Sequence, residues 1–304
     1  MTTGAALGEG RDVVVGIDAG GSSTRARAVR RNVLVHEGAG GPGNPLVAGP
    51  EIIHASYRSA LDGCPAAARV AACVSGGGGD AQRAQIAALL GGRFPGAVVH
   101  VAPDYVAAFL AAPPGSDVCV VAGTGSVVCS RAADGSFLVS GGRGWILGDH
   151  GGAARLGRAA LEHYVAGVCG VPASFAASVR QLFGDGDWRF IVRAVHAAPN
   201  PAPLLARAAP LLTTAAEDGH EWAMEQLSAE MTALAGTVAR HIEQHLAGIS
   251  RVRVALGGGV WASVAAQSAL TAALERLTRR PLTVTRSLAD PLAGAVRLAE
   301  SLQQ

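Results

Sequence analysis

The chain opens with a strand, a glycine-rich turn and a second strand. Residues 11–17 are mostly valine and isoleucine, which predicts a buried strand. Residues 18–23 carry the glycines and serines of a turn, and the alternating pattern of residues 24–29 predicts the returning strand.

The same pattern returns about a hundred residues later. Residues 117–122 and 127–131 predict two strands that flank the glycine turn at 123–126. A further strand at 252–256 leads into three glycines at 257–259, and helical periodicity follows from residue 260. This order indicates an internal duplication, and therefore two α/β domains.

Helical periodicity occupies much of the remaining chain. Apolar residues recur at helical spacing in four stretches, at 81–90, 105–112, 152–168 and 221–246. Residues 192–210 are rich in alanine and proline, and we expect a loop there.

The proline-rich segment 113–115 is the predicted domain boundary. It separates an N-terminal domain of residues 1–112 from a C-terminal domain of residues 113–304. We expect the last helix, at 291–304, to pack back onto the first domain.

The composition is that of a globular protein. Hydrophobic residues make up 49% of the chain, charged residues 16%, and the formal net charge is +2. The basic residues are scattered, so we expect no nucleic-acid or membrane-surface binding. Because no signal peptide or membrane-spanning run is recognisable, we expect a cytoplasmic protein. The five cysteines form no CxxC pair, which argues against a zinc site or a disulfide framework.

Lysine is absent, so all 25 of the lysine-plus-arginine positions are arginine. A Walker A loop, a protein-kinase active site and a pyridoxal phosphate enzyme each require a lysine. The sequence therefore excludes all three classes.

The glycine turns are candidates for phosphate binding. Glycine lets backbone N–H groups approach a phosphate, and serine or threonine hydroxyls add donors. Asp18 ends the first strand, where a carboxylate can hold Mg2+ against the phosphates. Two ordinary hairpin turns are the alternative, which the repetition of the pattern makes less attractive.

Three motifs resemble those of the sugar kinase, actin and Hsp70 superfamily. Residues 15–24 resemble its first phosphate motif, 122–126 its second and 256–260 its adenosine motif. The resemblance implies a ribonuclease-H-like, actin-like ATPase fold with ATP and Mg2+ in a cleft between the two domains. It implies nucleotide binding by Gly20, Gly21, Ser22, Ser23, Thr24, Gly123, Thr124, Gly125, Ser126, Gly257, Gly258 and Gly259, with Asp18 at the metal.

More closely, the chain resembles the N-acetylglucosamine kinases of the BadF/BadG/BcrA/BcrD ATPase family. Residues 41–45 resemble the sugar-binding loop of these enzymes, 141–151 their GGWG…GDEG signature and 290–295 their closing segment. The match follows the chain in order over nearly its whole length.

By this resemblance Asp104 is the catalytic base, which would take the proton from the attacking sugar hydroxyl. Asp104 follows the strand predicted at 98–101 and precedes the helix. The alternative is that Asp104 only caps that helix.

The resemblance also implies a set of sugar-binding residues. Hydroxyl-binding groups discriminate strongly between substrates, because a missing hydroxyl leaves them unsatisfied. For Asn44 and Asp149 the alternatives are a turn residue and a surface-loop residue, and for Ser75 with the glycines after it a plain loop. The set is Asn44, Ser75, Gly142, Arg143, Gly144 and Asp149.

Several positions depart from the family pattern. Pro103 replaces an asparagine before the base, Arg143 replaces a tryptophan, and His150 replaces a glutamate. Ser22-Ser23-Thr24 stands where the family carries Thr-Lys-Thr. A cationic Arg143 suits an acidic or phosphorylated substrate, or else it is a solvated side chain.

Three other patterns point to different chemistry. Residues 38–43 match the dinucleotide motif GxGxxG, but they lead into Asn-Pro rather than a helix. His241 and His245 have a metal-binding spacing without an accompanying glutamate. Cys119 and Cys129 flank the second turn, as in iron–sulfur activators, although a packed strand residue explains each of them.

The expected activity is ATP-dependent phosphorylation of a hexose or amino sugar, with N-acetylglucosamine first and glucosamine second, at the 6-hydroxyl. Family likeness also implies a homodimer. Two alternatives stay open: a non-catalytic regulator that senses nucleotide or sugar, and an ATPase that activates a partner enzyme.

Overall fold

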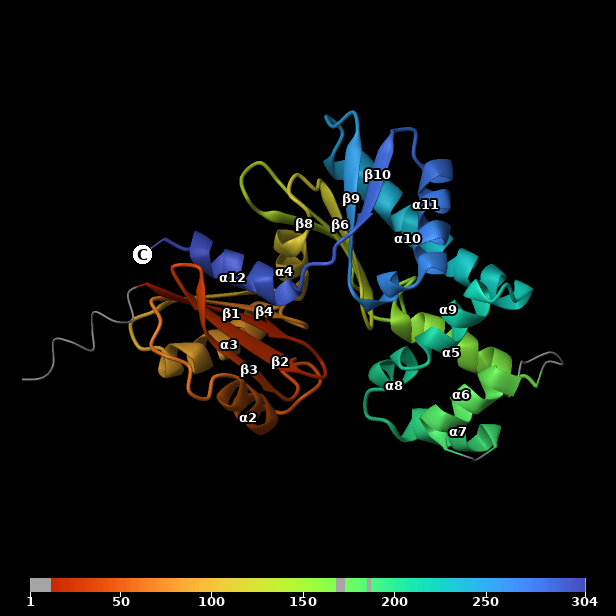
Figure 1. The fold of residues 1–304 in the computed structure, drawn as a ribbon, viewed down its shortest axis with the longest axis horizontal. Helices are drawn as coiled ribbons and strands as arrows, with labels where there is room; N and C mark the ends of the chain where they lie inside the picture. Colours follow the sequence, from red (N-terminus) through yellow and green to blue (C-terminus); the bar gives the residue numbers. More distant parts are fainter. Residues whose placement is uncertain (1–11, 168–172, 185–186, 304) are drawn as a thin grey trace, which may run out of the picture. The chain divides into compact units, whose positions relative to one another are not determined.

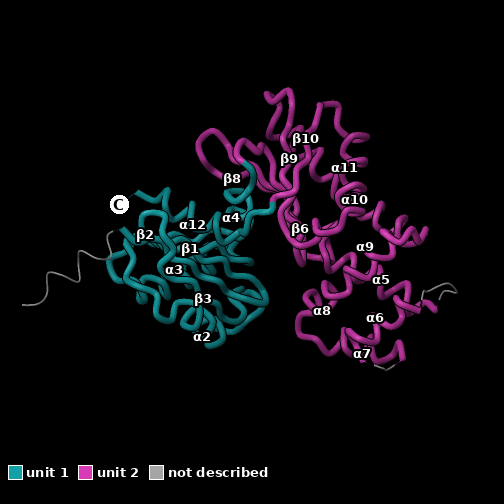
Figure 2. The backbone as a smooth tube through the Cα atoms, viewed as in Figure 1, with its two compact units in different colours: residues 1–113, 288–304 teal, residues 114–287 magenta. Residues whose placement is uncertain are grey.

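The computed structural model describes residues 12–167, 173–184 and 187–303. The chain divides into two units, Met1–Pro113 with Leu288–Gln304 (unit 1) and Pro114–Ser287 (unit 2), which Figure 2 distinguishes by colour. Each unit contains a five-stranded sheet with helices packed on it (Figure 1). The predicted two-domain α/β class is therefore confirmed.

The sheet of unit 1 has the strand order β3-β2-β1-β4-β5. β1 is antiparallel to β2 and parallel to β4, and β4 is parallel to β5. The elements are β1 (Val13–Ala19), β2 (Thr24–Arg30), β3 (Val33–Gly40), α2 (Pro50–Ala60), β4 (Arg69–Val74), α3 (Asp80–Arg93), β5 (Val98–Pro103), α4 (Asp104–Ala111) and α12 (Pro291–Ser301).

Helices cover both faces of this sheet. Alternate residues of β1 point to opposite faces, so Val13, Val15 and Ile17 join the large core with α2 and α3. Val14 packs on the other face, with α12. α12 crosses β1 closely, since a Cβ on Gly16 would lie 2.3 Å from the backbone nitrogen of Val296. The last helix of the chain is thus part of the first unit.

Unit 2 repeats the topology of unit 1. Its strand order, β8-β7-β6-β9-β10, has the same sequence of antiparallel and parallel pairings. The elements are β6 (Val118–Ala122), β7 (Ser126–Arg131), β8 (Phe137–Gly141), α5 (Ala153–Val165), α6 (Ala173–Phe183), α7 (Trp188–Ala197), α8 (Ala202–Ala206), α9 (Ala209–Glu217), α10 (Glu221–His245), β9 (Val252–Gly257), η1 (Gly259–Ala262), α11 (Val264–Leu277) and β10 (Leu282–Arg286).

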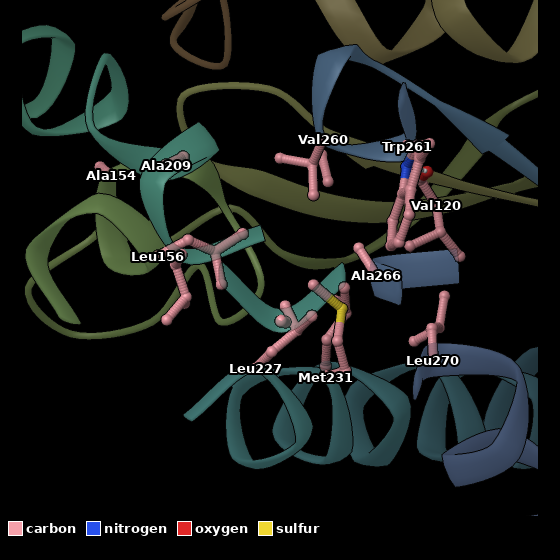
Figure 3. Close-up of a cluster of buried hydrophobic side chains, with 14 of the residues drawn as sticks. Val120, Ala154, Leu156, Ala209, Leu227, Met231, Val260, Trp261, Ala266 and Leu270 are labelled. Carbon is pink, nitrogen blue, oxygen red and sulfur yellow. Dashed lines mark hydrogen bonds between the residues drawn. The ribbon is translucent and has the colours of Figure 1, made fainter. Parts of the chain in front are cut away.

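The core of unit 2 gathers around Trp261, whose side chain is fully buried. Its indole N–H donates to the carbonyl of Val120 at 3.1 Å, which satisfies the only polar atom of the ring. Figure 3 shows Leu227 and Met231 of α10 in the same cluster as Ala266 of α11. This packing joins β6, the central strand of the sheet, to α10 and α11.

The loop predicted at 192–210 is wrong, because α7, α8 and α9 occupy most of this segment. Alanine favours helix, and Pro203 and Pro210 each lie in the first turn of a helix. Proline is tolerated there, since its missing N–H would have no partner within the helix. Alanine-rich sequence with proline at such positions is therefore compatible with short helices.

Three predicted elements extend past the described residues, namely the strand from residue 11, the helix to residue 168 and the last helix to residue 304. Within the described ranges, no helix combines the length and the apolar character needed to cross a bilayer.

Candidate active site

Three parallel strands of unit 1 end at one edge of the sheet. Ala19 pairs with Val74, and Val74 pairs with Pro103, so β1, β4 and β5 finish level with one another. The first phosphate turn, Ser75 and Asp104 follow directly after these strands. The sheet therefore brings together residues that the sequence predicts for phosphate binding, sugar binding and proton transfer.

Asp104 is the first residue of α4, and part of its surface is accessible. Burial raises the pKa of Asp104, and the neighbouring Asp18 carboxylate raises it further. Hydrogen bonds from the Ser75 hydroxyl and the Tyr105 N–H act in the opposite direction. A carboxyl group with a raised pKa, held in place by two donors, is suited to accept a proton.

The Asp18 carboxylate at the end of β1 is held by Arg25. Arg25 Nη2 donates to Asp18 Oδ2 at 2.6 Å, and the same guanidinium donates to the two oxygens of Asp290 at 2.8 and 3.0 Å. Burial opposes the charge on Arg25, but these two carboxylates leave its pKa raised. Asp290 also caps α12 through the N–H of Leu292. The sequence analysis missed this network, although Arg25 and Asp290 both lie beside motifs that it identified.

Asp18 and Asp104 bring two carboxylates to this edge. In phosphoryl-transfer enzymes Mg2+ is held by one or two carboxylates, with substrate phosphates and water as the other ligands. The pair fits that arrangement, because the charge of Asp18 raises the pKa of Asp104 and a cation would relieve this repulsion. Among the described residues, no cluster of three histidine, cysteine or acidic side chains could hold a metal without substrate.

The predicted sugar loop is fastened to the first phosphate turn. Gly43 N donates to Gly20 O at 2.9 Å, and Thr24 Oγ1 donates to Gly41 O at 3.0 Å. The side chain of Thr24 is fully buried, so its hydroxyl serves the loop and does not face outward, unlike the exposed turn residues Gly21, Ser22 and Ser23. This geometry ties the loop position to the turn.

Asn44 lies against the segment that follows β4. Its Oδ1 accepts from Leu46 N at 2.8 Å, and a Cβ on Gly76 would approach the same oxygen to 2.3 Å. Gly76 also has φ 76°, which favours glycine. Asn44 and Ser75 thus belong to one locality with Asp104.

The second glycine turn joins β6 to β7 in unit 2 and rests on the start of α5. The backbone nitrogens of Ala153 and Ala154 donate to Gly123 O and Thr124 O at 2.8 and 2.9 Å. A side chain at position 125 is excluded, because a Cβ on Gly125 would lie 2.2 Å from Asp149 Oδ2. The turn is therefore fixed by α5 on one side and by the predicted sugar residue on the other.

Residues 141–151 form a tight loop after β8 with Asp149 at its centre. Asp149 has φ 49° and accepts from Gly144 N at 3.1 Å, while Gly142 N donates to Ser126 O at 3.1 Å. Burial raises the pKa of Asp149, and hydrogen bonds from backbone N–H groups act against that rise. Arg143 lies in this loop and is exposed.

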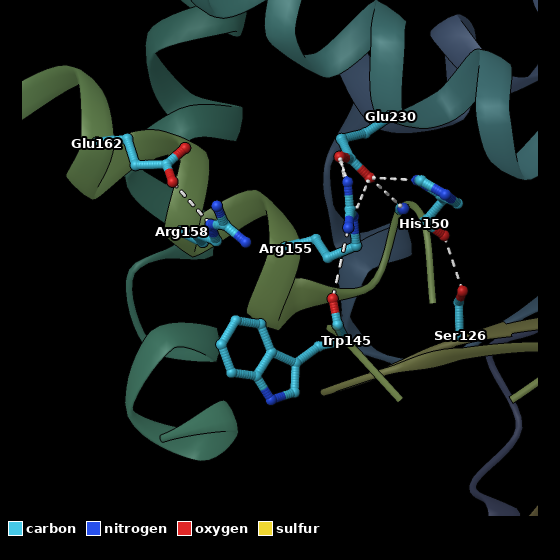
Figure 4. A network of polar contacts seen from close by, with 8 residues as sticks. Ser126, Trp145, His150, Arg155, Arg158, Glu162 and Glu230 are labelled. Atoms are coloured by element: carbon cyan, nitrogen blue, oxygen red, sulfur yellow. Dashed lines mark hydrogen bonds and ion pairs between the residues drawn. The ribbon is translucent and has the colours of Figure 1, made fainter. Parts of the chain in front are cut away.

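An ion pair between α5 and α10 supports the end of this loop (Figure 4). Arg155 donates through two nitrogens to Glu230, at distances of 2.7 to 3.0 Å. Burial opposes the charge on Glu230, but Arg155 and the N–H of Gly151 hold its pKa below the usual value. His150 Nδ1 lies 3.4 Å from Glu230, and Ser126 Oγ donates to the His150 carbonyl at 2.7 Å. His150, which departs from the family pattern, is thus placed by its neighbours.

The third glycine run meets the second turn at a cavity of about 490 Å3 in unit 2. Gly258 has φ 105° and lies against Ala122, since a Cβ there would be 2.4 Å from the carbonyl oxygen of that residue. Gly123, Thr124 and Gly259, which belong to two of the three predicted nucleotide motifs, line the cavity. Most of the remaining wall has no motif in the sequence, because it comes from the helices α5, α8 and α9 and from the end of η1. It includes Thr213, Glu217 and Ser263.

Other sequence patterns have structural roles. His241 is buried, and its ring nitrogens lie 2.9 Å from the hydroxyls of Ser130 and Ser140. Cys119 and Cys129 face each other across β6 and β7, and both are buried. Most of the GxGxxG match at 38–43 lies at the end of β3 and in the sugar loop.

Comparison with solved structures identifies the fold. A candidate N-acetylglucosamine kinase from Chromobacterium violaceum is 25% identical, with a TM-score of 0.67, covering 95% of this chain and 99% of that one. A second candidate N-acetylglucosamine kinase, from Porphyromonas gingivalis, is 20% identical with a TM-score of 0.74, covering 94% and 97%. The chain has the fold of the sugar kinases. A ROK family glucokinase from Streptomyces griseus, solved with glucose and AMPPNP, shares this fold at 16% identity and a TM-score of 0.60, covering 95% and 100%. No family model and no curated protein matches the chain.

Proposed function

We propose that the protein is an ATP-dependent sugar kinase. The observation that carries the proposal is the position of Asp104, a half-buried carboxyl with a raised pKa beside Ser75 and the first phosphate turn. The likeness to solved sugar kinases supports the same reaction class.

In the proposed reaction Asp104 accepts the proton of the sugar hydroxyl as that oxygen attacks the γ-phosphoryl group. The Ser75 hydroxyl and the Tyr105 N–H keep the carboxylate oriented. The proton ends on Asp104, the new O–P bond forms at the sugar oxygen, and ADP leaves.

Asp18, with Asp104 beside it, would hold Mg2+, which would neutralise phosphate charge during transfer. The turns at residues 20–23 and 123–125, which are exposed or half-buried, would bind the phosphates. Within unit 2, the cavity lined by Gly123, Thr124 and Gly259 is the proposed adenosine site.

The proposed substrate is a hexose or amino sugar, with N-acetylglucosamine first and glucosamine second, phosphorylated at the 6-hydroxyl. Two structural neighbours described as candidate N-acetylglucosamine kinases support this choice. Asn44, Ser75 and Asp149 are the proposed partners of the sugar hydroxyls.

ADP release with Mg-ATP and a panel of sugars tests the proposal. We expect sugar-dependent turnover in the natural protein and a loss of about a hundredfold or more in Asp104→Asn, since general-base catalysis contributes about 10²–10⁴. Asp62→Asn, on an exposed turn of the same unit, is the matched control and should keep full activity.

Turnover that survives in Asp104→Asn would reject this residue as the base. Retained ATP binding with no turnover on any sugar would instead favour the nucleotide- or sugar-sensing regulator.

A further inference from the structure

A second cavity of about 480 Å3 opens in unit 2 over β7 and β8. Its wall comes from these strands, from the 141–151 loop and from the C-terminal half of α10. We propose that this cavity binds the anionic group of a sugar acid or sugar phosphate. The inference rests on the proposed function, because it narrows the substrate class of the same sugar loop.

Most of the ionisable side chains that line the cavity are basic. Arg143 from the loop and Arg240 from α10 both line the cavity, together with His150 and His245. Asp149 is the one carboxylate among the lining residues. Two arginine side chains at one cavity make the electrostatic potential there positive.

Neither arginine has an acidic partner within the described part of the chain. Arg240 Nη2 reaches only the hydroxyl of Thr237, at 3.3 Å, and both arginines are exposed. Arg155, Arg158 and Arg253 of the same unit, in contrast, are paired with Glu230, Glu162 and Asp117. Both guanidinium groups at the cavity therefore remain available to an anion.

Asp149 forms no ion pair with either arginine in the described part of the chain, and its Oδ1 accepts from Gly144 N at 3.1 Å. Its single negative charge is outnumbered by the two guanidinium groups of the lining. Arginine binds carboxylate or phosphate through two parallel hydrogen bonds, so Arg143 and Arg240 suit such a group on a ligand.

The remaining lining suits the neutral part of a sugar. Ser140 and Gln244 bring polar side chains to the wall, and Val127, Val139 and Leu234 bring apolar ones. His241 holds the Ser140 hydroxyl at 2.9 Å, which fixes its direction. A cavity of this volume has the size of a small-ligand site.

Direct binding to the full-length protein without ATP tests the inference. Titration calorimetry would compare glucose 6-phosphate, glucuronate and inorganic phosphate with neutral glucose and N-acetylglucosamine. We expect at least one of the two sugar anions to bind at least about tenfold more tightly than its neutral counterpart, the order of effect of a charged hydrogen bond. The phosphate and carboxylate arms distinguish the two sources of charge, and inorganic phosphate measures binding of the anion alone.

Arg143→Gln and Arg240→Gln should each remove about tenfold of the affinity for the sugar anion and leave neutral sugars unchanged. Arg158→Gln, an exposed arginine on α5 of the same unit, is the matched control and should have no effect. Equal binding of charged and neutral sugars, or of the variants and the natural protein, would overturn the inference.

Turnover is measured separately, so the two proposals can fail independently. Turnover of neutral sugars with no binding of anions rejects only the anionic site. Anion binding that depends on both arginines, without turnover of any sugar, rejects only the kinase.

Discussion

At the scale of single residues, Arg25 connects two carboxylates that belong to different motifs. It bonds both Asp18, at the first phosphate turn, and Asp290, at the start of α12. One guanidinium therefore fixes the proposed metal ligand and the cap of a helix from the other end of the chain.

Arg25→Gln should lower the free energy of unfolding by about 1–3 kcal/mol, because it removes the cation beside Asp18 and leaves Asp290 with Arg27, 3.8 Å away, as its only cation among the described residues. Urea unfolding would measure the change. Arg31→Gln is the matched control, since Arg31 also lies 2.6 Å from an aspartate, Asp12, but with 82% of its side chain exposed. That variant should lose less than about 1 kcal/mol, and equal losses would contradict the importance of burial.

The buried His241 makes the stability of the protein depend on pH. Burial and the nearby His245 lower the pKa of His241 to about 4, from 6.5. The unfolded chain therefore binds more protons between these values, so the contribution of His241 is present above about pH 6.5 and is lost as pH falls toward about 4.

The difference in unfolding free energy between the natural protein and His241→Gln should accordingly shrink across that interval. Chemical denaturation at a series of pH values measures it. The exposed His196→Gln should show no such trend, and a pH-independent difference for His241→Gln would contradict the prediction.

At the scale of elements, close backbone contact with α4 excludes a side chain at position 294 of α12. A Cβ on Gly294 would lie 1.9 Å from the carbonyl oxygen of Ala107 in α4. In α3, by contrast, a Cβ added to Gly91 would lie in open space. Replacement of glycine by alanine should therefore have opposite effects on stability at these two positions.

Gly294→Ala should destabilise the protein by about 1–3 kcal/mol through overpacking. Gly91→Ala should stabilise it by up to about 1 kcal/mol, because alanine is the better helix former. Thermal unfolding of both variants checks the signs, and stabilisation by Gly294→Ala would show that α12 and α4 are not packed as described.

The sequence predicted elements best where a pattern and a turn agreed. Buried valine runs identified β1 and β6, and the glycines after them marked the turns. The helices between residues 188 and 217 were harder to predict from the sequence, because proline suggests a break unless it is known to lie in the first turn of a helix. For the site, motifs identified Asp104 and Asn44, whereas Glu217 and Arg240 lie on ordinary helices and join cavities only through the fold.

At the scale of the whole molecule, the two units have equivalent topology but differ in continuity. Unit 2 is a single stretch of chain, and unit 1 needs both ends, since α12 covers β1. The proposed base lies in unit 1, whereas the cavity of the adenosine site lies wholly in unit 2.

Residues 114–287 produced alone should fold and bind ATP, but release no ADP in response to sugar, because Asp104 is missing. Circular dichroism, calorimetry with ATP and the ADP assay would measure these three properties. A folded fragment that does not bind ATP would contradict the assignment of its cavity to the nucleotide.

The turn at residues 123–126 borders both cavities of unit 2. Gly123 and Thr124 line the one proposed for the adenosine, and Ser126 lines the one rich in arginine. A ligand that shifts this turn from one side therefore changes affinity on the other, and linkage requires the effect to be equal in both directions. Binding of the nucleotide would then change the affinity for the anion, and binding of the anion the affinity for the nucleotide, through a shared turn of four residues.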